Sequence, residues 1–175
     1  MMSGGMNAEL PTSSIAELTI QTGGFEAEYG NALSGVINVV TKSAPSTHQF
    51  MLHGATDDLH GGTASNKTAL LEGSAGGPVI GGMLSYYATL TWRRTGSRWW
   101  QDFARTMPDD IEHSLSSFGK LDYIHSPTTR LSAQLLYSQM DTRDYEFSWR
   151  FNLAGLPPRD RTSYRGALVL THLFD

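Results

Sequence analysis

The run LSYYATLTWRR, residues 84–94, decides the fold, because its side chains alternate in character along the chain. It is rich in aromatic and β-branched residues, which disfavour a helix and suit a strand. A period of two with one apolar and one largely polar side predicts a strand in a sheet with two chemically different faces. The apolar side carries Leu84, Tyr86, Ala88, Leu90 and Trp92.

The same alternation returns in three further runs toward the C-terminus, at residues 115–124, 131–140 and 164–171. Two earlier stretches, about 48–56 and 67–75, alternate more weakly, and we expect them to be strands as well. The sequence therefore predicts a nearly all-β protein whose larger part contains about six up-and-down strands.

The predicted connections between these strands alternate in length. Residues 77–82 and 125–130 form short connections, whereas 57–65 is of medium length and 95–113 and 141–162 are long. Bacterial outer-membrane barrels show this asymmetry, with short turns at one end and long loops at the other. The pattern favours a piece of an antiparallel transmembrane β-barrel.

Aromatic residues gather near the ends of the predicted strands, and two interpretations of them stay open. They are suited to the two membrane interfaces, where amphipathic rings form girdles. Strands also favour aromatic residues in general. The residues concerned are Tyr86, Tyr87, Trp92, Trp99, Trp100, Tyr123, Tyr137, Phe147 and Trp149.

Composition excludes several classes of protein. The 175 residues include 13 Lys and Arg against 17 Asp and Glu, a formal net charge of -4, and show no basic run that would attract a nucleic acid. The chain contains no cysteine, so a disulfide framework and a cysteine nucleophile are excluded. Its apolar stretches are shorter than the roughly 18 residues of a membrane-spanning helix, which leaves a β-barrel as the possible membrane form.

Motifs for catalysis or for cofactor binding are missing from the sequence. Residues 76–82, GGPVIGG, have the glycine spacing of a phosphate-binding loop but lack its Lys, so we interpret them as a turn. The six histidines include no metal-binding pair on one predicted element, and no G-x-S-x-G elbow occurs. We therefore expect neither an enzyme nor a cofactor nor a metal site.

The N-terminal region carries the most specific motif. Residues 15–30, IAELTIQTGGFEAEYG, followed by residues 35–43, GVINVVTKS, resemble the C-terminal end of the plug domain of TonB-dependent outer-membrane receptors. The chain departs from the family pattern at Ala16, Leu18 and Ser34. The positions of this chain that match the plug motif are Gly23, Gly24, Glu28, Tyr29, Gly30, Gly35, Asn38, Thr41 and Lys42.

A second motif narrows the resemblance to one branch of the family. Residues 76–80, GGPVI, followed by the aromatic strand at residues 84–87, look like the hairpin of the Oar-like, carboxypeptidase-regulatory-like receptors. The Lys that usually precedes this strand in that branch is absent here.

The resemblance implies a domain division and a function. Residues 1–44 would be the end of the plug and residues 45–175 the first strands of the barrel. Because a plugged transporter barrel has about 22 strands, the chain would be a partial receptor. Such receptors take up a scarce ligand, such as a siderophore, a carbohydrate or a peptide, across the bacterial outer membrane. The implied partners are outer-membrane lipid, the ligand, and TonB acting through a segment outside this chain.

Two groups of residues are predicted to make contacts in such a receptor. Glu28 would pair with a basic side chain of the barrel, although an exposed turn carboxylate is an alternative. Ligand contacts would come from two long loops, since loops on a rigid scaffold usually carry recognition. The residues predicted in these loops are Arg98, Trp99, Trp100, Arg143, Tyr145 and Trp149.

Two other functions compete with the receptor. A soluble all-β binding or adhesion module would bury the apolar side of its strands in a sandwich core. A passive porin-like barrel would share the membrane but lack a plug.

Overall fold

Among the residues that the computed structural model describes, the regular structure is β-strand apart from three short 3-10 turns. The strands form two antiparallel sheets, one of two strands and one of six, which confirms the all-β prediction. The structure describes residues 10–21, 36–57, 68–96, 111–143, 147–149 and 151–174.

The smaller sheet is a hairpin near the N-terminus. Strand β1 (Ile15–Gln21) pairs with β2 (Val36–Thr41), and a 3-10 turn, η1 (Thr12–Ser14), precedes β1. The backbone N–H of Lys42 donates to Ser14 O at 2.8 Å. This bond ties the end of β2 to η1, and we refer to η1 and the hairpin together as the N-terminal unit.

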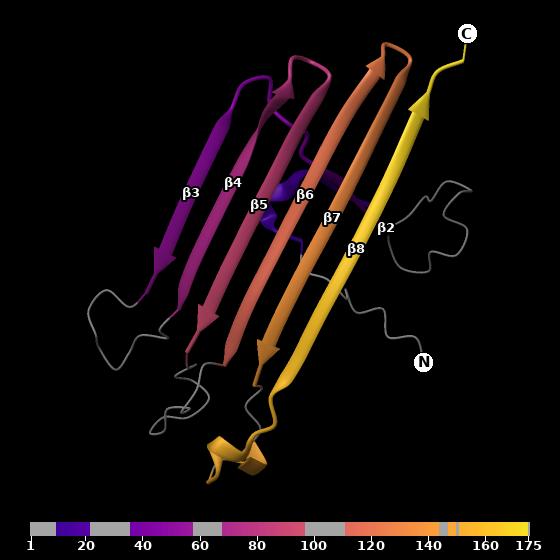
Figure 1. Cartoon of the computed structure of the whole chain (residues 1–175). Coiled ribbons are helices and arrows are strands. Elements are labelled where there is room, and N and C mark those ends of the chain that lie inside the picture. Colours follow the sequence, from indigo (N-terminus) through magenta and orange to yellow (C-terminus); the bar gives the residue numbers. More distant parts are fainter. Residues whose placement is uncertain are drawn as a thin grey trace.

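The larger sheet is a six-stranded meander in which each strand pairs with its neighbours in sequence (Figure 1). No further strand pairs with β3 or β8 among the described residues, so the sheet is open and no closed barrel is formed. Its strands are β3 (Gln49–Thr56), β4 (Ala69–Ile80), β5 (Leu84–Thr95), β6 (Glu112–Ser126), β7 (Thr129–Thr142) and β8 (Arg159–His172).

The connections sort by length to opposite ends of the larger sheet (Figure 1). Residues 81–83 and 127–128 form short turns at one end. The long connections join β3 to β4, β5 to β6 and β7 to β8 at the other end, and the last one contains η4 (Phe147–Trp149) and η5 (Leu153–Gly155). The predicted alternation of short and long connections is therefore confirmed.

The predicted turn at residues 76–82 is wrong in extent. Strand β4 continues to Ile80, and the turn covers residues 81–83 alone, with Gly82 at φ +73°. Gly76 and Gly77 of β4 permit a close approach of the preceding chain, because a Cβ on Gly76 would stand 2.8 Å from Cδ of Pro45. A glycine pair can indicate either a turn or a strand that another segment approaches closely. The sequence alone does not distinguish these two cases.

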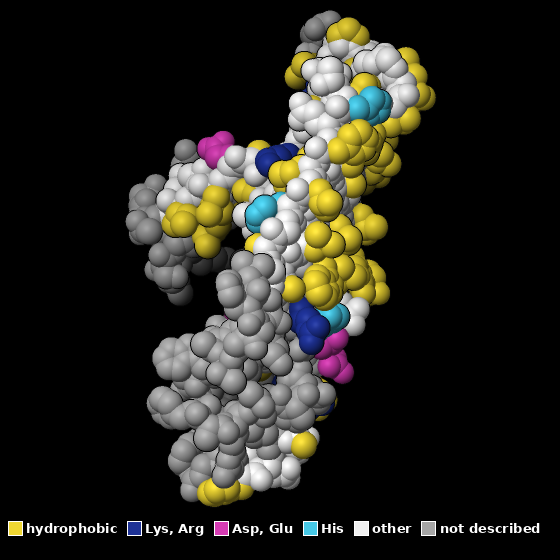
Figure 2. Space-filling view, turned by 90° about the vertical axis from the view of Figure 1, so that its left-hand side faces the viewer, with side chains coloured by type: hydrophobic (Ala, Val, Ile, Leu, Met, Phe, Trp, Pro, Cys, Tyr) yellow, Lys and Arg dark blue, Asp and Glu magenta, His cyan; other side chains and the backbone are white. Residues whose placement is uncertain are grey.

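The two faces of the larger sheet differ as the alternation predicts. Cross-strand pairing places Phe50, Ala75, Ala88, Gly119 and Leu135 in one row on the apolar face. Figure 2 shows hydrophobic side chains along this side of the sheet, opposite the N-terminal unit. The opposite face carries Glu72, Tyr87, Thr89, Ser116 and Lys120, and we call it the polar face.

Gly76→Ala is expected to destabilise the protein by about 1–3 kcal/mol, because the added methyl group overlaps Pro45 and the Tyr87 ring. Gly81→Ala is the matched control, since a Cβ there has no atom within 4 Å. Urea unfolding of the purified protein measures both changes. Equal midpoints for the two variants would contradict the close approach at Gly76.

Candidate functional site

The N-terminal unit contacts the polar face of the larger sheet at Ser13. The backbone N–H of Ser13 donates to Glu72 Oε1 at 3.1 Å, and Ser13 O accepts from the Tyr87 hydroxyl at 2.7 Å. The Ser13 Oγ is hydrogen-bonded to Thr89 Oγ1 at 2.5 Å. The N–H, the carbonyl and the hydroxyl of Ser13 are thus each hydrogen-bonded to one side chain of the sheet. We call these three side chains, Glu72, Tyr87 and Thr89, the Ser13 seat.

The strand period and the register build this seat. Tyr87 and Thr89 are two residues apart on β5, so both side chains point to the polar face. Ser74 of β4 lies opposite Thr89, which places Glu72 one step further along the same face. Ser13, Tyr87 and Thr89 are buried, so the hydroxyl groups of the seat are hydrogen-bonded away from water.

The N-terminal unit has internal bonds that keep η1 in shape. Ser14 donates both its N–H and its Oγ to Pro11 O, at 2.9 and 2.6 Å. Ser14 is 0% exposed. Together with the bond from Lys42, these contacts make η1 part of the hairpin rather than part of the larger sheet.

The segment that joins β2 to β3 forms a second contact with the polar face. Lys120 Nζ donates to Ser43 Oγ at 3.1 Å and forms an ion pair with Asp122 at 3.7 Å. Pro45 lies against the strand at Gly76. The N-terminal unit is therefore held before β1 by the Ser13 seat and after β2 by this linker.

The plug-motif residues predicted from the sequence divide into two groups. Asn38 and Thr41 lie on β2, opposite Thr19 and Ile15 of β1, and Lys42 directly follows β2. The rest, Gly23, Gly24, Glu28, Tyr29, Gly30 and Gly35, lie outside the described residues. The predicted pairing of Glu28 with a basic side chain of the barrel stays a prediction.

The predicted ligand-contact residues are also only partly described. Arg143 directly follows β7, and its backbone N–H donates to Ile111 O at 2.7 Å. Trp149 lies in η4, where its carbonyl accepts from the N–H of Asn152 at 2.8 Å. Both residues belong to the connection between β7 and β8, at the long-loop end of the sheet. Arg98, Trp99, Trp100 and Tyr145 lie outside the described residues.

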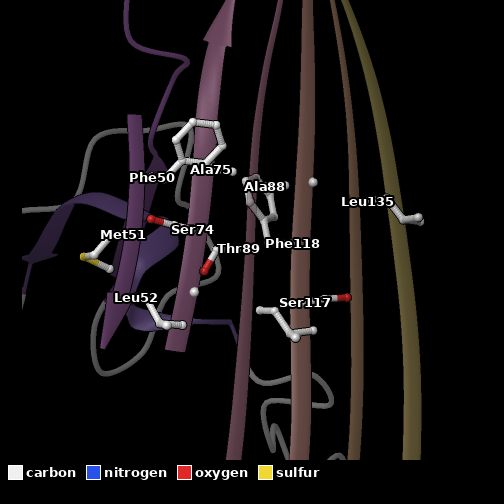
Figure 3. Close-up of a pocket in the computed structure, with 13 residues that line it drawn as sticks. Phe50, Met51, Leu52, Ser74, Ala75, Ala88, Thr89, Ser117, Phe118 and Leu135 are labelled. Atoms are coloured by element: carbon white, nitrogen blue, oxygen red, sulfur yellow. The ribbon is translucent and has the colours of Figure 1, made fainter. Parts of the chain in front are cut away.

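A hollow of about 770 Å³ lies on the apolar face (Figure 3). Side chains of Phe50 and Leu52 border it on the β3 side and Leu135 borders it on the β7 side. No charged side chain lines the hollow among the described residues, so it suits hydrocarbon and not a polar substrate. Its floor consists of the small residues Gly73, Ala75, Ala88, Ser117 and Gly119.

Neither the Ser13 seat nor the hollow is predicted by the sequence. The alternation in residues 84–94 places Tyr87 and Thr89 on the polar side, but it gives no sign of what they contact. The hollow depends on register, because Ala88 lies between Ala75 and Gly119 only once three strands are paired.

The described part of the chain contains neither a metal-binding cluster nor a membrane-spanning helix. No three His, Asp or Glu side chains there converge in a geometry that would hold a metal ion. No helix in the same residues is long and apolar enough to cross a membrane.

Comparisons with models of protein families, with curated proteins and with solved structures found no match.

Tyr87→Phe is expected to lower the free energy of unfolding by about 1 kcal/mol, because Ser13 O loses its donor at a buried site. Tyr164→Phe is the control, since Tyr164 is exposed on β8. Urea unfolding followed by tryptophan fluorescence compares the two. An equal loss of unfolding free energy in both variants would show that the Tyr87 hydroxyl does not hold Ser13.

Proposed function

We propose that this chain is part of a TonB-dependent outer-membrane receptor, which takes up a scarce ligand across the bacterial outer membrane. It comprises the end of the plug, in residues 1–44, and the first barrel strands, in residues 45–175. The observation that carries the proposal is the arrangement of the larger sheet, whose apolar face is exposed while its polar face holds the N-terminal unit. A barrel wall with a plug inside it has this arrangement.

The dimensions of the apolar face support a membrane-spanning wall. On β6 the apolar face extends from Leu115 to Tyr123, which are eight residues apart. Eight steps of about 3.4 Å give roughly 27 Å along the strand. A tilt of about 40° reduces this to roughly 21 Å across the membrane, comparable with the apolar band of about 25 Å in outer-membrane barrels.

The long-loop end of the apolar face becomes polar, as an interface with lipid headgroups requires. At the long-loop end, pairing places Arg94, His113, Asp141 and Asp160 in one row. Trp92 lies two residues from Arg94, and its indole N–H donates to His113 at 3.2 Å. An indole with an apolar body and a bonded N–H at the edge of an apolar band is typical of a membrane-interface girdle.

The exposed apolar face argues against a soluble binding module. Leu52, Leu135, Leu168 and Leu170 are all exposed, and no second sheet covers them among the described residues. A soluble sandwich would bury such residues between two layers. In our proposal outer-membrane lipid covers them.

The position of the N-terminal unit argues against a passive porin. A porin needs a polar lumen that is open to water. Here the Ser13 seat and Lys120 bind residues that precede the meander in the sequence. Besides lipid, the receptor would need two partners, its ligand and TonB, which would act through a segment outside this chain. We propose neither a cofactor nor an enzymatic step.

Leu135→Arg is expected to prevent stable assembly in the outer membrane. Leu135 is 61% exposed in the middle of β7, and an arginine facing lipid at mid-depth costs about 2–4 kcal/mol. Gln134→Arg places the same charge on the polar face and should assemble normally. Outer-membrane fractionation and protease resistance of the receptor measure assembly. Detergent-free solubility of the unmodified protein would favour the soluble module instead.

Deletion of residues 1–44 from the receptor is expected to open a channel, because the N-terminal unit then no longer occupies the polar face. Planar-bilayer recordings should show no steady conductance for the intact receptor and a large conductance for the deletion variant. High conductance of both proteins would favour the porin.

The role of TonB is tested in the host bacterium. A medium is chosen in which the receptor gene confers a growth advantage, and we expect deletion of the TonB gene to abolish that advantage. Growth that is independent of TonB would overturn the active-uptake proposal and leave the membrane assignment unaffected.

A further inference from the structure

We propose that the polar face of β7 and β8 is a binding site for an anionic ligand that carries at least two oxyanion groups, either carboxylates or phosphates. Arg161 and Arg165 of β8 bind these groups. The inference rests on the proposed function and deepens it, because it names the chemical class of the ligand that the receptor would take up.

The strand period places the arginines of β8 on one face of the sheet. Arg165 lies in the row of paired residues that contains Thr89 of the Ser13 seat. Arg161 and Arg159 are four and six residues before Arg165 on the same strand, so both point to the same side. All three arginines are therefore on the polar face, to which the N-terminal unit is bound.

Charge is segregated between the two faces of β7 and β8, which the structure describes in full. Their acidic residues, Asp141 and Asp160, pair with each other on the apolar face. The polar face of the two strands carries no acidic side chain and several basic ones. The basic residues there are Arg130, Arg159, Arg161 and Arg165. This half of the polar face is therefore positively charged.

Arg161 and Arg165 are available to a ligand. Both side chains are exposed, and neither forms an ion pair with another described residue. Lys120 on β6 differs, because its ammonium group already contacts Ser43 and Asp122. The cations that await a partner thus lie on β8.

The N-terminal unit does not occupy this part of the sheet. Its hydrogen bonds go to Glu72 on β4 and to Tyr87 and Thr89 on β5. Among the described residues, no hydrogen bond joins it to β7 or β8. The docked unit therefore leaves both arginines accessible on the face where a receptor of this kind would admit its ligand.

The spacing of the two arginines selects an extended anion. Four steps of about 3.4 Å separate the Cα atoms of Arg161 and Arg165 by roughly 14 Å. A monovalent ion binds one guanidinium at a time, whereas a ligand with several oxyanion groups can bind both. The planar guanidinium forms two parallel hydrogen bonds with a carboxylate or a phosphate. A neutral carbohydrate lacks these groups.

Calorimetric titration of the purified full-length receptor tests the site with two probes. Tripolyphosphate presents phosphates and citrate presents carboxylates, so the probes distinguish the two sources of the oxyanion. We expect at least one of them to bind, with an affinity that falls as the salt concentration rises. Acetate, which has a single carboxylate, should bind much more weakly than citrate.

Arg161→Gln and Arg165→Gln should each weaken binding of the probe by about tenfold, because each removes one charge-assisted contact. Arg161→Lys retains the charge and should weaken binding less than Arg161→Gln does. Arg94→Gln is the matched control and should leave the affinity unchanged. Arg94 is exposed at the same end of the sheet, but it lies on the apolar face in the row that contains Asp160.

Two results would overturn the site. The first is that the unmodified receptor binds neither tripolyphosphate nor citrate. The second is an equal loss of affinity in Arg161→Gln and Arg94→Gln, which would show a general effect of net charge. The thermal unfolding midpoint of each variant is measured alongside, and we expect it to be unchanged because both arginines are exposed.

The titration requires neither TonB nor transport. A receptor whose uptake is independent of TonB can still bind the probes at Arg161 and Arg165. Uptake that depends on TonB, in a receptor that binds neither probe, would overturn the anionic site alone.

Discussion

The antiparallel register of β4, β5 and β6 is the constraint on which the rest of the structure depends. One row of paired residues, Gly76, Tyr87 and Lys120, faces the N-terminal unit. The adjacent row, Ala75, Ala88 and Gly119, forms the floor of the apolar hollow on the other face. A shift by one residue would exchange the two faces, so a single register sets both the Ser13 seat and the exposed apolar surface.

The two faces impose different requirements on their surroundings. Buried hydroxyl groups on the polar face need hydrogen-bond partners, because an unpaired buried polar group costs free energy. Ser13 supplies such partners to Tyr87 and Thr89. The apolar face needs an apolar cover, and the exposed leucines show that the described part of the chain does not provide one. The described residues thus supply a partner for the polar face of the sheet and leave its apolar face uncovered.

Much of the sheet was predictable because alternation is a local property. Residues 84–94 alone indicate a two-faced strand, and β5 covers them as expected. The extent of β4 was not predictable from its sequence, because Gly76 and Gly77 favour a turn when they are considered alone. Glycine is required there because the linker crosses the strand at Pro45, about thirty residues earlier in the sequence, and leaves no room for a side chain.

The sequence by itself determined the strand period, the two faces and the alternation of short and long connections. These features follow from residues close together in the chain, where side-chain spacing and turn chemistry suffice. Only the tertiary structure decided the Ser13 seat and the hollow. Ser13 lies 59 residues from Glu72 and 76 from Thr89, and no local pattern links them. Their meeting depends on strand register and on how the N-terminal unit docks, which are settled by contacts across the whole chain.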